Sequence, residues 1–418
     1  MKLASVVVVG GGHAAAQLCS SLADAGRARG VVLISAEAIT PYHRPPLSKT
    51  FLQASAEEPQ LHREPGWYAE HGIELMLGRR AIAIDRLRHE VELDDGTCLA
   101  YEQLVLATGC RPRVLAPFDR PLRNVHALRS AGDATALRTI LLSDAPGSLS
   151  VLGGGFIGLE VAATARKLGW QVKIFEVAGR LLARAASPDL AEHVLEQHRE
   201  QGSEVHLGFR IDAVEVDGGS VRTLRSGAQE HEVQRLLLGV GAVPETELAQ
   251  RAGLLVDNGI VVDASLRTSD PAILAIGDCA AFPLNDRHLR LESVQNANDQ
   301  AKVAAAILNG QHARYQPLPW FWSDQGSVRL QMAGLWRDGL QTHQRQGATP
   351  ASFSLFHYEG DRLVCVESVN APVDHLMARK LLVQRHSPRP VQVSDPTVPL
   401  KSLLGLDAGA GSGRSEHQ

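Results

Sequence analysis

A strand, a glycine turn and a helix follow one another twice in this chain, and the two copies start 143 residues apart. Each turn follows a short β-branched run and precedes an alanine-rich stretch typical of a helix. A second apolar strand comes after each helix and ends in an acid, Glu37 in the first copy and Glu176 in the second. The turn positions are Gly10, Gly12 and Ala15 in the first copy and Gly153, Gly155 and Gly158 in the second. This order of elements is that of a nucleotide-binding βαβ unit.

Each part of this pattern has a physical reason. The first glycine allows a tight turn, the second lets the backbone approach a pyrophosphate, and the third lets the helix pack close to the strand. The helix N-terminus then faces the phosphates, and the acid accepts hydrogen bonds from a ribose hydroxyl. Two copies in full context predict two dinucleotide sites. A carboxylate at Glu176 favours NADH, because it repels a 2′-phosphate; the alternative is an acid that only ends a surface strand.

Composition narrows the class of protein. A length of 418 residues predicts two to three domains, and 44% hydrophobic with 21% charged residues is typical of a folded globular chain. The formal net charge of −4 argues against a nucleic-acid binder. No apolar run approaches the roughly 20 residues that span a bilayer, and we expect neither a membrane segment nor a signal peptide.

Cysteine and histidine usage favours a reduced compartment and no metal. The five cysteines are odd in number and far apart, without a CxxC pair or a zinc spacing, so we expect a cytoplasmic protein. The 17 histidines are scattered, and the sequence assigns none of them as a metal ligand. HExxH, GxSxG and P-loop motifs are absent as well, so these hydrolase chemistries are not supported.

Further segments complete an α/β pattern. Apolar runs end at glycine at 103–109, 235–241 and 272–277, as buried parallel strands do. A helix is predicted over 297–308, and the alternation over 352–369 predicts antiparallel strands. The Gly/Ser-rich segment 405–418 is predicted to be a disordered tail.

Several separated motifs resemble one known family. They are Arg44-Pro-Pro-Leu-Ser-Lys49, Ala107-Thr-Gly109, Gly153 to Glu160, Ala275-Ile-Gly-Asp278, Glu292-Ser-Val-Gln-Asn-Ala297 and Trp320-Phe-Trp-Ser-Asp-Gln325. Together they resemble the FAD-dependent NADH–ferredoxin reductases of bacterial oxygenase systems, over the chain to about residue 404. Three positions depart from the family pattern, Glu245, Gln295 and Gly326.

The resemblance implies an α/β fold with two Rossmann-like dinucleotide-binding domains, as in glutathione reductase, and a C-terminal α+β domain. It implies an FAD domain over 1–115 and 245–319, an inserted NAD domain over 116–244, and the C-terminal domain over 320–404.

The resemblance also implies site residues. Lys49 would lie near the flavin N5 atom and Glu160 beside the nicotinamide carboxamide, and these two are the predicted catalytic residues. Asp278 would hold the ribityl chain, the helix entered at Val294 would face the pyrimidine ring, and Trp320 would shield the flavin. The predicted cofactor-binding residues are Gly10, Gly12, Ala15, Glu37, Arg44, Pro46, Lys49, Ala107, Thr108, Gly109, Gly153, Gly155, Gly158, Glu160, Glu176, Gly241, Gly277, Asp278, Val294 and Trp320.

Without a close cysteine pair, electrons are expected to leave the flavin directly. A flavin can release electrons singly, which suits a 2Fe–2S ferredoxin as partner, and through it an oxygenase. Two alternatives stay open: an NADH oxidase or rubredoxin reductase, and a redox-signalling flavoprotein resembling apoptosis-inducing factor. Nothing in the sequence requires more than a monomer or a weak dimer.

Overall fold

The computed structural model describes residues 3–143, 145–284 and 287–404. Within these ranges the chain forms two compact units. The first consists of Met1–Gly179 and His198–Pro317, and the second of Arg180–Gln197 and Leu318–Gln418. The predicted tail at 405–418 lies outside the described residues. No helix in the described part of the chain is both long and apolar enough to cross a membrane.

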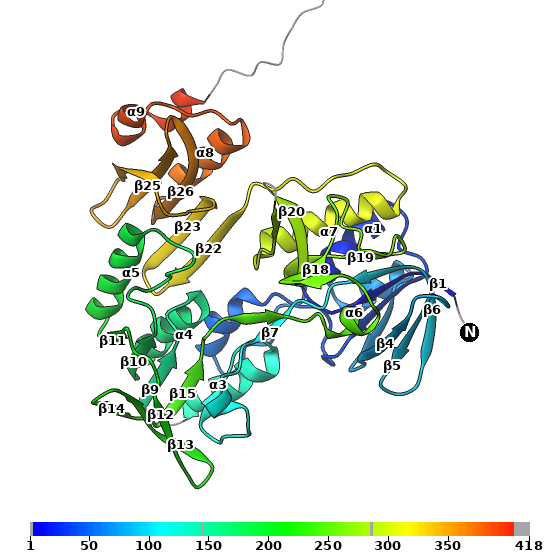
Figure 1. Cartoon of the computed structure of the whole chain (residues 1–418), viewed down its shortest axis with the longest axis horizontal. Coiled ribbons are helices and arrows are strands. Elements are labelled where there is room, and N and C mark those ends of the chain that lie inside the picture. Colours follow the sequence, from blue (N-terminus) through cyan, green and yellow to red (C-terminus); the bar gives the residue numbers. More distant parts are fainter. Residues whose placement is uncertain (1–2, 144, 285–286, 405–418) are drawn as a thin grey trace, which may run out of the picture. The chain divides into compact units, whose positions relative to one another are not determined.

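A seven-stranded sheet contains the first of the two repeated units (Figure 1). Its strands β1, β2, β3, β6 and β19 pair in parallel, and β5 and β4 continue it in antiparallel fashion. Val7 and Val8 are fully buried, because both faces of the parallel part are covered. The order is β3-β2-β1-β6-β5-β4, with β19 beside β6; the strands are β1 (Leu3–Val9), β2 (Val31–Ser35), β3 (Glu74–Leu77), β4 (Ala81–Asp85), β5 (Glu90–Leu93), β6 (Cys98–Leu106) and β19 (Ile273–Ala275).

Helices α1 (His13–Asp24) and α7 (Val294–Leu308) lie side by side in this part of the first unit (Figure 1). Their contact is rich in alanine, with Ala15, Ala301 and Ala304 fully buried, so the two backbones can approach closely. Both helices match the predicted helical stretches. Two short 3-10 helices, η1 (Pro45–Ser48) and η2 (Thr50–Leu52), and helix α2 (Pro65–Glu70) follow β2.

A second, fully parallel sheet contains the second repeated unit. Its order is β11-β10-β9-β15-β8, with β8 (Val125–His126), β9 (Ser148–Leu152), β10 (Gln171–Glu176), β11 (Glu204–Leu207) and β15 (Arg235–Leu238). Helices α3 (Ala131–Ser143) and α4 (Phe156–Lys167) belong to this part of the first unit, whereas most of α5 (Pro188–Glu200) belongs to the second unit. The prediction of two Rossmann-like units is confirmed.

Smaller elements complete the first unit. They are η3 (Ala116–Phe118), α6 (Glu247–Arg251), η4 (Gly277–Cys279), the sheet of β12 (Ala213–Asp217), β13 (Ser220–Ser226) and β14 (Gln229–Glu232), the sheet of β17 (Val256–Asp257), β18 (Gly259–Val261), β20 (Ala280–Leu284) and β21 (Arg287–Leu289), and the pair β7 (Cys110–Pro112) and β16 (Ala242–Pro244). Strands β7 and β16 run antiparallel where the chain enters and leaves the second parallel sheet.

The second unit contains an antiparallel five-stranded sheet, as the alternation in the sequence predicts. Its order is β22-β23-β26-β25-β24, with β22 (Trp320–Gln325), β23 (Val328–Gly334), β24 (Gln341–Gln346), β25 (Phe353–Glu359) and β26 (Arg362–Val369), followed by α8 (Pro372–Val383), α9 (Pro390–Ser394) and η5 (Leu400–Leu403). The predicted fold class, two Rossmann-like domains with a C-terminal α+β domain, is confirmed.

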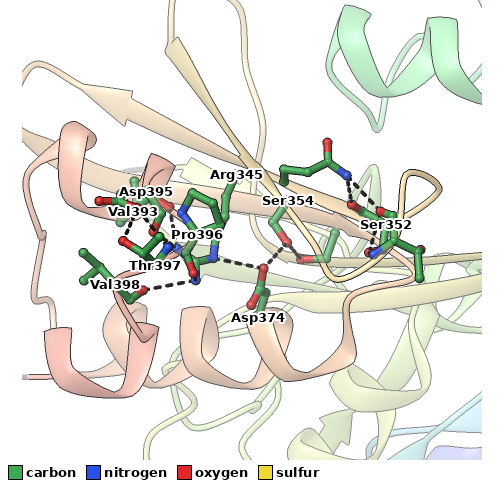
Figure 2. A network of polar contacts seen from close by, with 12 residues as sticks. Arg345, Ser352, Ser354, Asp374, Val393, Asp395, Pro396, Thr397 and Val398 are labelled. Carbon is green, nitrogen blue, oxygen red and sulfur yellow. Dashed lines mark hydrogen bonds and ion pairs between the residues drawn. The ribbon is translucent and has the colours of Figure 1, made fainter.

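A buried arginine holds the C-terminal segment against this sheet (Figure 2). Arg345, on β24, is 7% exposed. Its guanidinium donates to the backbone oxygens of Val393, Asp395 and Val398 at 3.1, 2.6 and 3.1 Å. It also lies 3.5 Å from the carboxylate of Asp374 on α8. One side chain therefore satisfies the carbonyl groups of an otherwise irregular segment.

Candidate functional site

Both glycine turns lie where the strand order of a parallel sheet reverses. Strand β1 has β2 on one side and β6 on the other, and β9 has β10 and β15. In open parallel sheets, ligands bind at such reversal points, outside the carboxyl ends of the strands. The turns after β1 and β9 are therefore the candidate binding sites.

The first turn needs glycine for reasons of geometry. Gly10 has a φ of +125°, and a Cβ there would lie 2.1 Å from the backbone oxygen of Ala107. A Cβ at Gly12, in contrast, would meet no atom within 4 Å. Gly12 is the N-cap of α1 and supplies no side chain to the first N–H groups of that helix. These amides leave a positive helix end free to bind an anion such as a diphosphate.

The acid predicted for this unit is held in place by two neighbours. The carboxylate of Glu37 lies 2.6 Å from Arg44 and accepts a hydrogen bond from the Tyr42 hydroxyl at 2.6 Å. Arg44 also donates to the backbone oxygen of Arg129 at 2.7 Å, while its Nε is buried and has no partner among the described residues. Glu37 and Arg44, predicted from separate motifs, are thus brought together.

Asp278 lies at the same turn. A Cβ on Gly277 would be 3.1 Å from that of Ala14 in the first turn of α1, so the η4 turn is close to the helix N-terminus. Arg129 lies 3.5 Å from the Asp278 carboxylate. Burial raises the pKa of Asp278, and the Arg129 guanidinium opposes that rise.

The segment at 107–109 connects this turn to the strands that lead to the second sheet. Thr108 donates from its hydroxyl to the backbone oxygen of Glu245 at 2.6 Å, and the Glu245 N–H donates to Gly109 O at 2.9 Å. Gly109 and Gly241 have φ of +70° and +101°, which favour glycine. Gly109 and Gly241, both predicted cofactor-binding residues, thus determine the local backbone conformation of this connection.

The second turn repeats the geometry of the first. Gly153 has a φ of +108°, and a Cβ there would lie 2.4 Å from Gly239 O. A Cβ on Gly158 would be 2.7 Å from Gly153 O, so this position needs glycine for the close packing of α4. Gly155 is the N-cap of α4 and offers no side-chain cap. Glu176 accepts the N–H of Gly154 at 2.6 Å, which ties the acid to the turn.

Lys49 and Glu160 meet in an ion pair. Lys49 Nζ lies 2.7 Å from Glu160 Oε2, with side chains 18% and 4% exposed. The Ser48 hydroxyl donates to the same carboxylate oxygen at 2.5 Å, and Thr164 donates from its hydroxyl to Ser48 O at 2.9 Å. The pair joins the loop after the first nucleotide-binding unit to the helix that begins the second. The two predicted catalytic side chains therefore meet at one point.

Three of the predicted cofactor-binding residues, Pro46, Val294 and Trp320, lie outside the two glycine turns. Pro46 is within η1, and its backbone oxygen accepts the Lys49 N–H at 3.0 Å. Val294 is the first residue of α7, whose N-cap is Ser293. Trp320 begins β22 in the second unit, so its predicted contact with the flavin stays a prediction.

The structure adds residues that the sequence did not point to. Ser48 and Arg129 are paired with the predicted Glu160 and Asp278, and Gln300 accepts the Gly277 N–H at 2.6 Å. Only Ser48 lay inside a motif that could have drawn attention to it. Arg129 reaches the site from a segment without any recognisable pattern.

Comparison with known proteins identifies the family. The pyridine nucleotide-disulphide oxidoreductase model matches residues 4–301, and the reductase C-terminal model matches 320–404. Rhodocoxin reductase of Rhodococcus erythropolis is 42% identical over 406 residues, covering 96% of this chain and 94% of the relative. The anthranilate 1,2-dioxygenase system ferredoxin–NAD(+) reductase component of Burkholderia cepacia is 41% identical over 403 residues, covering 95% and 98%.

Solved structures agree with this. A ferredoxin reductase from Rhodopseudomonas palustris superposes with a TM-score of 0.90 at 38% identity, covering 96% of this chain and 99% of that one. A covalent putidaredoxin reductase–putidaredoxin complex gives the same TM-score and identity, covering 96% and 98%. The chain therefore belongs to the pyridine nucleotide-disulphide oxidoreductase family and carries its reductase C-terminal domain, as the sequence motifs predicted.

Proposed function

We propose that this protein passes electrons from NADH through FAD to a 2Fe–2S ferredoxin, which supplies an oxygenase. The observation that carries the proposal is the Lys49–Glu160 ion pair, which joins the loop after the first glycine turn to helix α4, whose N-terminus, like that of α1, has no side-chain cap. Relatives named as ferredoxin reductases of oxygenase systems support the same partner class.

The residues of the first turn fit FAD. The uncapped N–H groups of α1 and the unpartnered Nε of Arg44 can donate to a diphosphate, and the open side of Gly12 leaves room for it. Glu37 can accept from a ribose hydroxyl, and Asp278 from the ribityl chain. When bound, FAD accepts a hydride from NADH and can release the two electrons singly.

Lys49 and Glu160 would orient the reacting groups. A cation at Lys49 favours negative charge beside it, and Glu160 with Ser48 holds that ammonium in one position. Glu160 also belongs to the first turns of α4, where the predicted nicotinamide would bind. We propose that the Lys49–Glu160 pair aligns the flavin and the nicotinamide. Lys49 would also stabilise negative charge on the flavin.

The cysteines support direct electron exit. All five are free, and four of them are buried. Burial raises the pKa of Cys19 to about 12 and also raises the pKa of Cys110 and Cys279, so none of these three is a ready thiolate. Electrons would pass from the cofactor to the partner without a thiol intermediate.

We further propose the domain boundaries predicted from the sequence, a cytoplasmic location, and a monomeric or weakly dimeric state. Trp320 would shield the flavin, and Val294 would place the N-terminus of α7 towards it.

The test is anaerobic. The purified protein is mixed with NADH, flavin bleaching is followed, and cytochrome c reduction is then measured with and without a 2Fe–2S ferredoxin. Rapid bleaching with ferredoxin-dependent reduction supports the proposal. Fast oxygen uptake without ferredoxin dependence would instead identify an NADH oxidase, and bleaching without either activity would favour the redox-signalling alternative.

Glu176 provides a separate prediction. Replacing Glu176 with Ala is expected to lower the preference for NADH over NADPH about 10-fold, because one ribose acceptor and one charge that repels phosphate are lost. The ratio of kcat/KM values for the two nucleotides measures this. Glu204→Ala, an exposed acid on the neighbouring strand β11, is the matched control. An unchanged ratio in the Glu176 variant would show that this acid only fastens the turn.

A further inference from the structure

Three imidazoles meet beside the first glycine turn, although they are far apart in the sequence. His13 is the first residue of α1, His43 lies just before η1, and His62 lies just before α2. One ring nitrogen from each lies within 4.8 Å of the other two. The ring centroids of His43 and His62 are 3.8 Å apart, and those of His13 and His62 are 4.6 Å apart.

The backbone holds these rings together. The His43 N–H donates to Gln60 O at 2.8 Å, and the His62 N–H donates to Pro41 O at 2.9 Å. These bonds flank the antiparallel bridge between residues 42 and 61. His13 is fixed by its helix. The cluster is therefore organised by main-chain contacts that do not depend on the imidazoles themselves.

Two of the three imidazoles have a buried ring nitrogen without the partner that buried polar groups normally have. His13 is 8% exposed, and the Nε2 atoms of His13 and His62 are buried without a hydrogen-bond partner among the described residues. Burial, more than any other cause, lowers the pKa of His13 to about 3 and of His62 to about 4, and that of His43 is lowered too. A neutral imidazole keeps one nitrogen lone pair, which is the form that binds metal ions.

We propose that His13, His43 and His62 bind a Zn²⁺ ion or a similar imidazole-preferring divalent cation. Three histidines with a water in the fourth position make a common zinc coordination set. Zn–N bonds of about 2.0–2.1 Å place tetrahedral donors about 3.4 Å apart, so the ring nitrogens, now within 4.8 Å of one another, would move closer when they bind the ion. Without a carboxylate among the three donors, the site does not suit Mg²⁺ or Ca²⁺. The ion would tie the loop that carries Arg44 and Lys49 to α1.

Nearby positive charges are largely balanced. Arg44 lies 2.6 Å from Glu37, and Arg129 lies 3.5 Å from Asp278. Arg63 is exposed to water, which screens its charge. These guanidinium groups therefore repel a cation at the three rings only weakly, because each is paired with a carboxylate or screened by water.

A second histidine cluster in the same chain serves as the comparison. It consists of Glu204, His206 and His231. Here Nε2 of His206 already lies 2.8 Å from Glu204, and Lys173 lies 3.9 Å from the same carboxylate, which is 53% exposed. The Nε2 atoms of His206 and His231 are also buried without a hydrogen-bond partner among the described residues, but this cluster already pairs one imidazole with an exposed carboxylate, whereas the first cluster contains imidazoles alone.

The experiment titrates Zn²⁺ into tag-free, chelator-treated protein that retains its flavin, with binding followed by calorimetry and metal content. We expect one tight Zn²⁺ per chain. Losing an outer partner of a metal ligand already costs about 10–100-fold in affinity, so His62→Gln and His43→Asn are each expected to weaken binding at least about 100-fold. His206→Gln is the matched control and should bind as the parent does.

Two results would overturn the proposal: no tight Zn²⁺ in the parent protein, or loss of binding in His206→Gln but not in His62→Gln. Zinc-edge X-ray absorption of the parent protein does not depend on how the variants fold. It should show three imidazoles and one oxygen, and fewer than three imidazoles would contradict the site. If the histidine variants lose flavin while the parent binds no zinc, the cluster serves the cofactor and the metal proposal is wrong.

Discussion

Replacing Lys49 with Met is expected to slow reduction of the bound flavin by NADH about 100-fold, as removal of one charge-stabilising donor does in other enzymes. The variant removes the ammonium partner of the buried Glu160 carboxylate, which still accepts a hydrogen bond from Ser48. Breaking a buried ion pair costs about 3–5 kcal/mol in the free energy of unfolding. We expect a loss of stability at the lower end of this range, because the Lys49 side chain is partly exposed. Stopped-flow absorbance and urea unfolding measure the two effects.

A double-mutant cycle separates chemistry from stability. Glu160→Gln keeps an acceptor for Ser48 and removes the charge, so adding it to Lys49→Met should recover part of the lost stability without restoring the rate. Lys167→Met is the matched control, since Lys167 lies on the same helix as Glu160, is exposed, and donates to the Gln53 side chain at 2.8 Å. Equal flavin reduction in Lys49→Met and Lys167→Met would remove Lys49 from the proposed chemistry.

Arg345→Met is expected to give the largest loss of stability in the second unit, about 3–5 kcal/mol. Met fills much of the same volume but cannot donate to Val393, Asp395 or Val398, and it leaves Asp374 without its cation (Figure 2). Hydrogen exchange over 390–404 should accelerate before the sheet itself does, because these carbonyl groups have lost their shared donor.

The same variant should show a defined pH dependence. Burial raises the pKa of Asp374, and Arg345 opposes that rise. A carboxyl whose pKa is higher in the folded state favours folding most when it is protonated, and stability is lost as the pH rises through the folded value. Without Arg345 that pKa rises further. The defect of Arg345→Met should therefore be larger at pH 7 than near pH 4, close to the unfolded pKa of about 3.9.

Arg337→Met is the control for this prediction. Arg337 is 54% exposed and pairs with Glu359, which also pairs with Arg362. Surface pairs of this kind contribute about 0–1 kcal/mol. A loss in Arg345→Met no greater than in Arg337→Met would show that the C-terminal segment is held by its apolar contacts.

The two nucleotide-binding units could be predicted from the sequence because their constraints are local. Gly10 and Gly153 adopt positive φ beside a carbonyl oxygen, so no other residue fits, and the motif is visible without any tertiary contact. Apolar strands covered on both faces also leave a continuous pattern. Fold class and family could therefore be predicted together.

The partners within the site could not be predicted in the same way. Lys49 and Glu160 each belong to a motif, but their 2.7 Å contact joins segments more than 100 residues apart. Arg129, which pairs with Asp278, lies in a segment without a recognisable motif. Arg345 donates to backbone oxygens of the C-terminal segment, at Val393 and Asp395. Such pairings depend on how whole elements pack, and side-chain type alone does not encode them.

The histidines show most clearly which features can be predicted from the sequence and which depend on the tertiary structure. His13, His43 and His62 are three among 17, with no metal-binding spacing, so their residue types and order predict no site. Helix α1 and the bridge between residues 42 and 61 bring them within 4.8 Å of one another. Sequence by itself determined the glycine turns, the strands and the family, because local sterics and periodicity encode them. Only the tertiary structure decided which distant side chains meet, because that depends on the packing of the folded chain.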